Sequence, residues 1–264
     1  MHRYWAVLLL TFLCSATAWA QSSSATGQGS PQLSGDYEVL SLVWRPAFCA
    51  LPENTHRKEC QPGATSTQLM LDGLSLFWDR NGDGKRNDDD RYCIDDPALR
   101  TDIIAKDKAA QRDWSGLPEA PISESTRDAL TAVMPRVLSG LERHEWLKHG
   151  TCSGLSADGF FALTVKMTRD VLDNAFGEAI IENAGEVVER KILRAAFRLR
   201  YGKARLPALT LNCVKGPDGR DMLLEARIRV TREYADRGIV GSSLDAREIG
   251  KKGTCGKEFL IPAP

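Results

Sequence analysis

Two imidazoles, a carboxylate and an ammonium group occur within six residues of this chain. They belong to segment 144–152, whose sequence is HEWLKHGTC. On a helix, at about 100° per residue, His144 and Lys148 lie about 40° apart, and Glu145 and His149 lie further round the same side. The apolar pair between them lies on the opposite side and can anchor the helix in a core. Groups that transfer protons or bind an anion therefore share one face of the helix, and such a combination of residue types is typical of a catalytic site.

The spacing of the histidines disfavours a zinc site. The zinc-protease motif His-Glu-x-x-His places its histidines four apart, about 40° apart around a helix. His144 and His149 are five apart, about 140° around the helix, so one helix does not direct both at one ion. Taken alone, the segment is also compatible with a charged, solvated helix end before a structural cysteine.

Four other segments accompany this one. They are LSLVWRPAFC at 40–49, FFAL at 160–163, PALTLNC at 207–213 and LEARI at 224–228. Together with HEWLKHGTC they resemble the ribonuclease T2 family, whose second active-site segment reads His-Glu-x-x-Lys-His-Gly-Thr-Cys. The resemblance covers roughly residues 37–262. It implies an α+β fold, a single domain with a central antiparallel sheet flanked by helices.

The resemblance also implies an endoribonuclease that requires no cofactor for catalysis. Such cleavage uses the ribose 2′-OH as nucleophile and gives a 2′,3′-cyclic phosphate and a free 5′-OH, so RNA is the substrate and DNA is not. Each proton-transfer group contributes about 10²–10⁴-fold, and cations stabilise the charge on the phosphorane oxygens. By resemblance, His149 is the base-type histidine, while Lys148, Glu145 and His144 hold and polarise the phosphate.

One position departs from the family. The family's first active-site segment reads Leu-His-Gly-Leu-Trp-Pro, but residues 71–76 here read LDGLSL. Asp72 stands in place of the histidine, and Ser75 and Leu76 replace the Trp-Pro that helps to bind a base. A carboxyl with an ordinary pKa of about 3.9 is ionised near neutrality and is then a poor acid. His56, in a polar loop, is expected at the surface rather than as a substitute.

Two outcomes follow from Asp72. Burial can raise the pKa of its carboxyl, which would give a weakened ribonuclease with an acidic optimum. Alternatively, the chain is an inactive homologue that acts as a binding or inhibitory protein. A calcium-dependent protein that uses the ribonuclease fold only as a scaffold is a third hypothesis.

The chain begins with a stretch typical of a signal peptide. The apolar run 6–13 follows Arg3, and an Ala-x-Ala site ends at Ala20, so we expect residues 1–20 to be removed. The apolar run is too short for a membrane anchor. Residues 21–35 form a polar, flexible lead, and residues 36–264 form the ribonuclease-like domain. An exported protein, periplasmic in a bacterium or secreted, is expected.

Six cysteines remain after residue 20: Cys49, Cys60, Cys93, Cys152, Cys213 and Cys255. An even number in an exported chain predicts three disulfides, for which sequence alone allows 15 connectivities. A metal–thiolate cluster is disfavoured because the chain has no Cys-x-x-Cys pair. The family resemblance implies the pairs Cys49–Cys60, Cys93–Cys152 and Cys213–Cys255.

Charge favours an enzyme over a dedicated RNA-binding module. The chain has 35 basic and 35 acidic residues, and removal of Arg3 with the leader leaves a net charge of −1. Proteins that bind nucleic acid by neutralising phosphates are usually basic. We therefore expect an enzyme that meets RNA transiently. We also expect a monomer with no membrane anchor.

Segment 79–90, DRNGDGKRNDDD, has the spacing of a calcium loop. Oxygen donors at positions 1, 3, 5, 7, 9 and 12 would be Asp79, Asn81, Asp83, Lys85 (through its carbonyl), Asn87 and Asp90. A structural calcium ion is expected to brace the active site. A solvated acidic turn rich in Asn-Gly and Asp-Gly is the alternative.

Hydrophobic periodicity predicts the elements that position these groups. Strands are expected at 37–44, 67–77, 209–214 and 222–230, and helices at 125–134, from 135 through 149, at 157–172 and at 186–200. In the last helix, a stripe is expected to face the core: Val188, Ile192, Ala195, Ala196 and Leu199. Helices clustered between two groups of strands indicate an α+β fold.

Overall fold

Two long antiparallel strands form the centre of the sheet. The computed structural model describes residues 37–64, 68–77, 91–247 and 253–264. Strand β1 (Tyr37–Trp44) pairs with β2 (Leu69–Phe77) on one side and with β5 (Asp221–Val230) on the other. All eight residues of β1 are buried, as expected for a central strand. The predicted strand 37–44 is confirmed, and the strand predicted at 67–77 is described from Leu69.

The remaining strands complete a sheet of order β2-β1-β5-β6-β3, with β4 also paired to β5. They are β3 (Val187–Glu189), β4 (Leu209–Lys215) and β6 (Glu258–Leu260). All pairs are antiparallel except β5 with β6. The expected α+β domain with a central, largely antiparallel sheet is confirmed.

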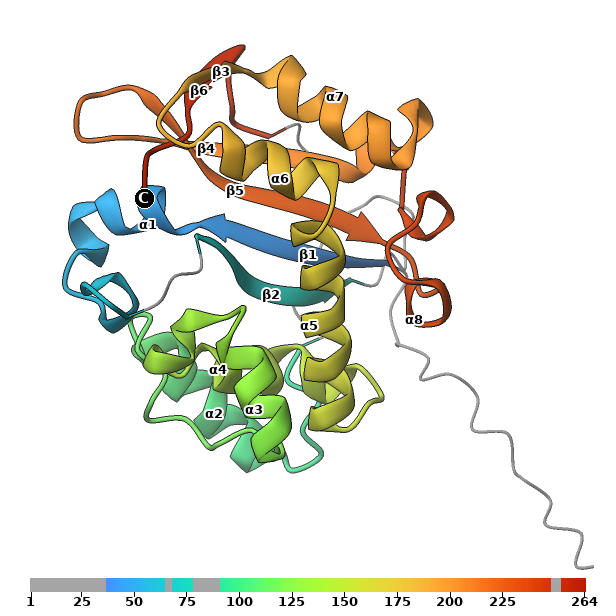
Figure 1. Cartoon of the computed structure of the whole chain (residues 1–264). Coiled ribbons are helices and arrows are strands. Elements are labelled where there is room, and N and C mark those ends of the chain that lie inside the picture. Colours follow the sequence, from blue (N-terminus) through green and yellow to red (C-terminus); the bar gives the residue numbers. More distant parts are fainter. Residues whose placement is uncertain (1–36, 65–67, 78–90, 248–252) are drawn as a thin grey trace, which may run out of the picture.

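Helices lie on both sides of this sheet (Figure 1). Helices α2, α3 and α4 gather beside β2, and α6 and α7 lie beyond β4 and β5. Their bounds are α1 (Arg45–Ala50), α2 (Pro97–Ala109), α3 (Glu124–Thr131), α4 (Leu141–Lys148), α5 (Ala157–Leu172), α6 (Ala175–Glu182), α7 (Arg190–Tyr201) and α8 (Tyr234–Arg237). Among the described residues, no helix is long and apolar enough to cross a membrane.

Helix α5 joins the two groups of helices through the core. The Ser156 hydroxyl accepts a hydrogen bond from Gly159 N at 3.1 Å and caps its first turn. Phe160, Met167 and Val171 recur at helical spacing and are completely buried against β1 and β2. Burial of such a side chain contributes about 1.5–3 kcal/mol. The predicted helix 157–172 is confirmed.

The helix predicted from 135 through 149 is divided into two elements. Residues Pro135–Ser139 form a 3₁₀ turn, and α4 begins only at Leu141. Between them, Gly140 has a φ of 71°, and a Cβ there would lie 2.7 Å from the carbonyl carbon of Trp114. The chain reverses at a position that only glycine fits, which ends the turn and redirects α4. The helix predicted at 125–134 is α3 and ends at Thr131.

The predicted apolar stripe of helix 186–200 is wrong. Val188 belongs to strand β3 rather than to the helix, so the helical phase inferred from it does not hold. Leu199 is 81% exposed, and the buried residues of α7 are Leu193, Phe197 and Tyr201. The two aromatic side chains bury more area than the alanines and isoleucine of the predicted stripe, so they determine which face packs.

Three disulfides hold the domain, with the predicted pairing. They are Cys49–Cys60, Cys93–Cys152 and Cys213–Cys255. The middle bridge spans 59 residues and ties the chain after β2 to the 3₁₀ turn after α4. A bridge of this kind typically contributes about 2–4 kcal/mol by restricting the unfolded chain.

Candidate active site

Helix α4 places Glu145 directly over strand β2. A Cβ on Gly73 would overlap the Glu145 carboxylate, so this close approach requires glycine at position 73. Glu145 is buried, and its Oε2 has no hydrogen-bond partner among the described residues. Burial raises the pKa of Glu145 to about 7, although the charges of His144 and Lys148 oppose the shift. A carboxyl that titrates near neutrality therefore lies between α4 and β2.

His144 is held by a carboxylate from α2. Its Nδ1 lies 2.6 Å from Asp107 Oδ1, and the hydroxyl of Tyr92 donates to Asp107 Oδ2. Burial acts to raise the pKa of Asp107, but the hydrogen bond and charge of His144 outweigh it and lower the pKa. The Trp114 ring lies 4.8 Å from the His144 ring, measured between centroids. Asp107 thus fixes the orientation of His144.

The second ring nitrogen of His144 faces the other charged groups of α4. Its Nε2 lies 3.2 Å from Lys148 Nζ and 3.8 Å from Glu145 Oε1. The structure therefore brings together three of the groups predicted from the sequence. Asp107 and Tyr92 were not predicted as part of the site.

His149 lies just beyond the end of α4 and faces β2. The predicted helix through residue 149 ends at Lys148, and the His149 N–H caps it by donating to Glu145 O at 3.0 Å. The His149 ring is buried, and its Nε2 lies 3.4 Å from Ser75 Oγ. Ser75 of β2 therefore contacts the ring of His149.

Asp72 forms an ion pair that the sequence did not predict. Its carboxylate accepts from Nη1 of Arg136, which comes from the 3₁₀ turn before α4. The side chain of Asp72 is 31% exposed, whereas that of Arg136 is only 6% exposed. The carboxylate of Asp72 is thus paired with a buried cation.

A second carboxylate and two rings enclose Arg136. Its Nε lies 3.6 Å from Glu59 Oε1, and Ser139 Oγ donates to Glu59 Oε2 at 2.7 Å. The guanidinium carbon lies 4.9 Å from the Phe48 ring centroid and 5.6 Å from that of Trp114. These contacts desolvate the guanidinium and compensate its charge, which is the condition for keeping a buried arginine.

Two other sequence predictions concern residues outside this group of side chains. His56 is exposed, as expected for a surface loop residue. The predicted calcium loop 79–90 lies outside the described residues. Within the described residues, no cluster of three or more histidine, cysteine, aspartate or glutamate side chains is placed to hold a metal ion.

The model of the ribonuclease T2 family matches residues 35–237. This chain belongs to the ribonuclease T2 family. The match contains both strands β1 and β2, helix α4 and the groups described above.

Relatives from this family cover nearly the whole chain. The chain is 28% identical over 238 residues to ribonuclease I of Escherichia coli (strain K12), which covers 86% of this chain and 87% of the relative. It is also 28% identical over 238 residues to intracellular ribonuclease LX of Solanum lycopersicum, covering 87% of this chain and 86% of the relative.

Solved structures show the same fold at lower identity. Ribonuclease MC1 from bitter gourd seeds is 20% identical, with a TM-score of 0.52, and covers 86% of this chain and 100% of its own. RNase NT in complex with 5′-AMP is 17% identical, with a TM-score of 0.51, covering 86% and 98%. These likenesses support the T2 fold of this chain.

Proposed function

We propose that this protein is an endoribonuclease that cleaves RNA by attack of the ribose 2′-OH on the adjacent phosphate. The grouping of His144, Glu145, Lys148 and His149 against strand β2 carries the proposal. The names of the two relatives, both ribonucleases, support it.

In this mechanism His149 accepts the 2′-OH proton. Its ring is buried beside Ser75, which limits competition from water. The 2′ oxygen then forms a bond to phosphorus, and the bond from phosphorus to the 5′ oxygen breaks. Lys148, with His144 held by Asp107, lies where it can stabilise the charge that grows on the phosphorane oxygens. The products are a 2′,3′-cyclic phosphate and a 5′-OH.

The leaving 5′ oxygen needs a proton, and this is where the enzyme is weakened. At the position of the family's histidine, the carboxyl of Asp72 can supply a proton only in its neutral form. Its ion pair with Arg136 engages the ionised form. We therefore propose slow cleavage that improves at acidic pH, with water as the proton donor near neutrality.

A second candidate function is a catalytically inactive homologue that acts as a binding or inhibitory protein. The observation that favours it is the same Asp72–Arg136 pair, because an ion-paired carboxylate is a poor substitute for an imidazolium. Under this alternative the phosphate-binding groups of α4 remain and the proton donor is lost.

Four further proposals concern the leader, the export, the oligomeric state and the metal content of the protein. Residues 1–20 and the lead 21–35 lie outside the described residues, and we propose that the first is a cleaved signal peptide. The three disulfides support export to a periplasm or to the medium. We also propose that the mature protein is a monomer, and that loop 79–90 binds a structural calcium ion.

The test is RNA cleavage by the oxidised protein between about pH 4 and pH 8, beside His149→Ala and a matched control, His56→Ala. His56 is exposed, so its loss should leave the rate unchanged. Loss of His149 should lower kcat by about 10²-fold or more, and DNA should remain uncut. Cleavage that survives in His149→Ala contradicts the mechanism. If the wild type binds RNA tightly but does not cleave it, the protein is the inactive homologue of the second proposal.

A further inference from the structure

Helix α7 and the turn after it concentrate positive charge on a chain that is neutral overall. Residues 190–205 contain no aspartate or glutamate. The cations in this segment are Arg190, Lys191, Arg194, Arg198, Arg200, Lys203 and Arg205. Since the whole chain has equal numbers of acidic and basic residues, this local excess is a feature of the surface and not of the composition.

The fold directs this charge outward. Leu193, Phe197 and Tyr201 fill the buried face of α7, which leaves the arginine row at 190, 194 and 198 on another side. Residues four apart on a helix are separated by about 6 Å along its axis. That separation is similar to the distance between neighbouring phosphates of one nucleic-acid strand.

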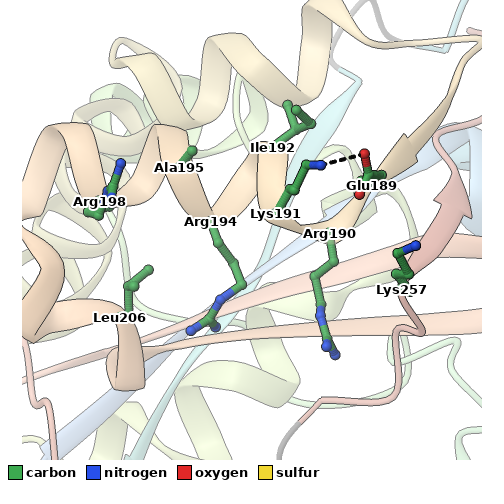
Figure 2. Close-up of a pocket in the computed structure, with 9 residues that line it drawn as sticks. All are labelled: Glu189, Arg190, Lys191, Ile192, Arg194, Ala195, Arg198, Leu206 and Lys257. Atoms are coloured by element: carbon green, nitrogen blue, oxygen red, sulfur yellow. Dashed lines mark ion pairs between the residues drawn. The ribbon is translucent and has the colours of Figure 1, made fainter.

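The arginine row borders a hollow of about 650 Å³. In Figure 2, Arg190 and Arg194 extend from α7 in the same direction, and Lys257 lies beside them from the chain leading into β6. We define the basic hollow by its cationic lining residues, which are Arg190, Lys191, Arg194, Arg198 and Lys257. The cations thus line a concave surface from two separate segments.

Only part of this charge is used within the protein. Lys191 pairs with Glu189 at 2.7 Å, and Arg190 Nη1 donates to Cys255 O at 2.9 Å. Within the ranges that the structure describes, the side chains of Arg194, Arg198 and Lys257 have no ion pair or hydrogen bond. Three cations that line one hollow without a partner there are available to an anionic ligand.

We propose that the basic hollow is a second RNA-binding site, one that holds the phosphate backbone of long single-stranded RNA. Figure 1 shows α7 on the far side of the sheet from α4, so the hollow is separate from the active site. A short substrate at α4 would not reach it, whereas a long strand would contact both. The choice of RNA as the polyanion rests on the proposed function.

The surface fits a phosphate backbone better than other ligands. Bases are usually held by stacking on exposed aromatic rings, but the hollow is lined by no aromatic residue, and Tyr201 of α7 is buried. A helix that binds a lipid surface presents a broad apolar face outward. Two large apolar side chains of α7, Ile192 and Leu199, are exposed, but Leu193 and Phe197 point into the core and the exposed side also carries Arg194 and Arg198. We therefore expect binding that depends on salt and is insensitive to base sequence.

The experiment measures binding, so that it does not depend on catalysis. The ligand is an uncleavable 2′-fluoro RNA of about 30 nucleotides, titrated at several salt concentrations against the oxidised full-length protein. The variant Arg194→Gln/Arg198→Gln/Lys257→Gln removes the three unpartnered cations. The control Lys106→Gln/Lys166→Gln/Arg220→Gln removes three exposed cations from other surfaces, each paired with an aspartate. The melting temperature of each variant shows that it is folded.

Removal of the three unpartnered cations should weaken RNA binding about tenfold at low salt. It should also reduce the slope of the logarithm of the binding constant against the logarithm of the salt concentration by about 2, because each phosphate contact contributes about 0.7. The control should bind as the wild type does. Equal weakening by both variants, or by neither, would overturn the proposal. Loss of binding to anionic lipid vesicles with RNA binding unchanged would also overturn it. A protein that cuts no RNA can still bind RNA at α7, so this result and that of the cleavage test are independent.

Discussion

The carboxylate of Asp72 is paired with the buried guanidinium of Arg136. From the sequence resemblance, we expect Asp72 to stand where the family has its first active-site histidine. Arg136 in turn lies 3.6 Å from Glu59, so one cation serves two carboxylates. Asp72, Arg136 and Glu59 therefore form one group of opposite charges. Replacement of Asp72 changes the proton donor and the charge balance together, and two variants are needed to separate these effects.

We predict that Asp72→His increases kcat for RNA cleavage, by up to about 10²-fold, because an imidazolium can protonate the leaving oxygen. The gain should be largest at acidic pH, because the nearby Arg136 disfavours a second cation. Asp72→Asn is the control, since it removes the negative charge without supplying a proton. The measurement is kcat between about pH 4 and pH 8. Equal rates for the two variants would mean that relief of charge repulsion, and not proton donation, limits the wild type.

The raised pKa of Glu145 predicts a pH dependence of substrate binding. Below about pH 7 the neutral carboxyl can donate to a phosphate oxygen, and above it the carboxylate repels the phosphate. KM should therefore rise as the pH increases through about 7, and Glu145→Gln should flatten this profile. Glu142→Gln is a matched control, because Glu142 is a buried glutamate of the same helix that pairs with Arg143 and Arg127 instead. A profile that is unchanged in Glu145→Gln would assign the titration to another group.

Local signals in the sequence are sufficient to predict the strands and helices that have a strong hydrophobic periodicity. Strand 37–44 and helix 157–172 agree with the structure because each combines a regular apolar pattern with a clear end, such as the Ser156 cap. Helix α2 was not predicted, although Asp96 and Pro97 form a typical helix start. Its few buried residues give it a weak apolar pattern, so the cap was the only available signal.

The groups of the candidate site are of two kinds, those contained in one sequence motif and those brought together by packing. The groups of α4 are contiguous, so a single motif identifies them. Arg136 reaches Asp72 from 64 residues away, and Asp107 reaches His144 from 37 residues away. These partners are brought together by tertiary packing, in which the 3₁₀ turn contacts β2 and Asp107 of α2 contacts His144 of α4. No local pattern marks an arginine or an aspartate for such a contact, and only the three-dimensional structure reveals it.

Calcium removal tests the loop at 79–90. The loop follows β2 in the chain and precedes Cys93, so we predict that bound calcium stabilises the segment beside the active site. Chelation should lower the melting temperature by about 2–4 °C for each kcal/mol of binding energy lost. Asp83→Asn should abolish the effect of the chelator, and Asp88→Asn, which lies outside the ligand spacing, should not. An unchanged melting temperature, with no calcium retained by the purified protein, would contradict the proposal.

The buried carboxyl of Glu38 makes the free energy of unfolding depend on pH. It lies on β1, is completely buried, and neither carboxylate oxygen has a hydrogen-bond partner among the described residues. Burial raises the pKa of Glu38 from 4.5 to about 8, against the opposing charge of Arg232. The folded protein therefore holds a proton that the unfolded chain releases between these two pKa values.

Because the pKa of Glu38 is higher in the folded protein than in the unfolded chain, Glu38 makes the protein less stable as the pH rises. The contribution of Glu38 is fully present below about pH 4.5, and it is lost as the pH rises toward about 8. Each such group lowers the free energy of unfolding by at most about 1.4 kcal/mol per pH unit in that window. Glu145, whose pKa is raised to about 7, acts in the same direction.

Urea denaturation between about pH 5 and pH 8 measures this effect. The free energy of unfolding should decline less steeply with pH in Glu38→Gln than in the wild type. The exposed residue Glu53 provides the control, because Glu53→Gln should leave the slope as it is. If Glu38→Gln declines as steeply as the wild type, the carboxyl of Glu38 is hydrated in solution and does not hold the proton.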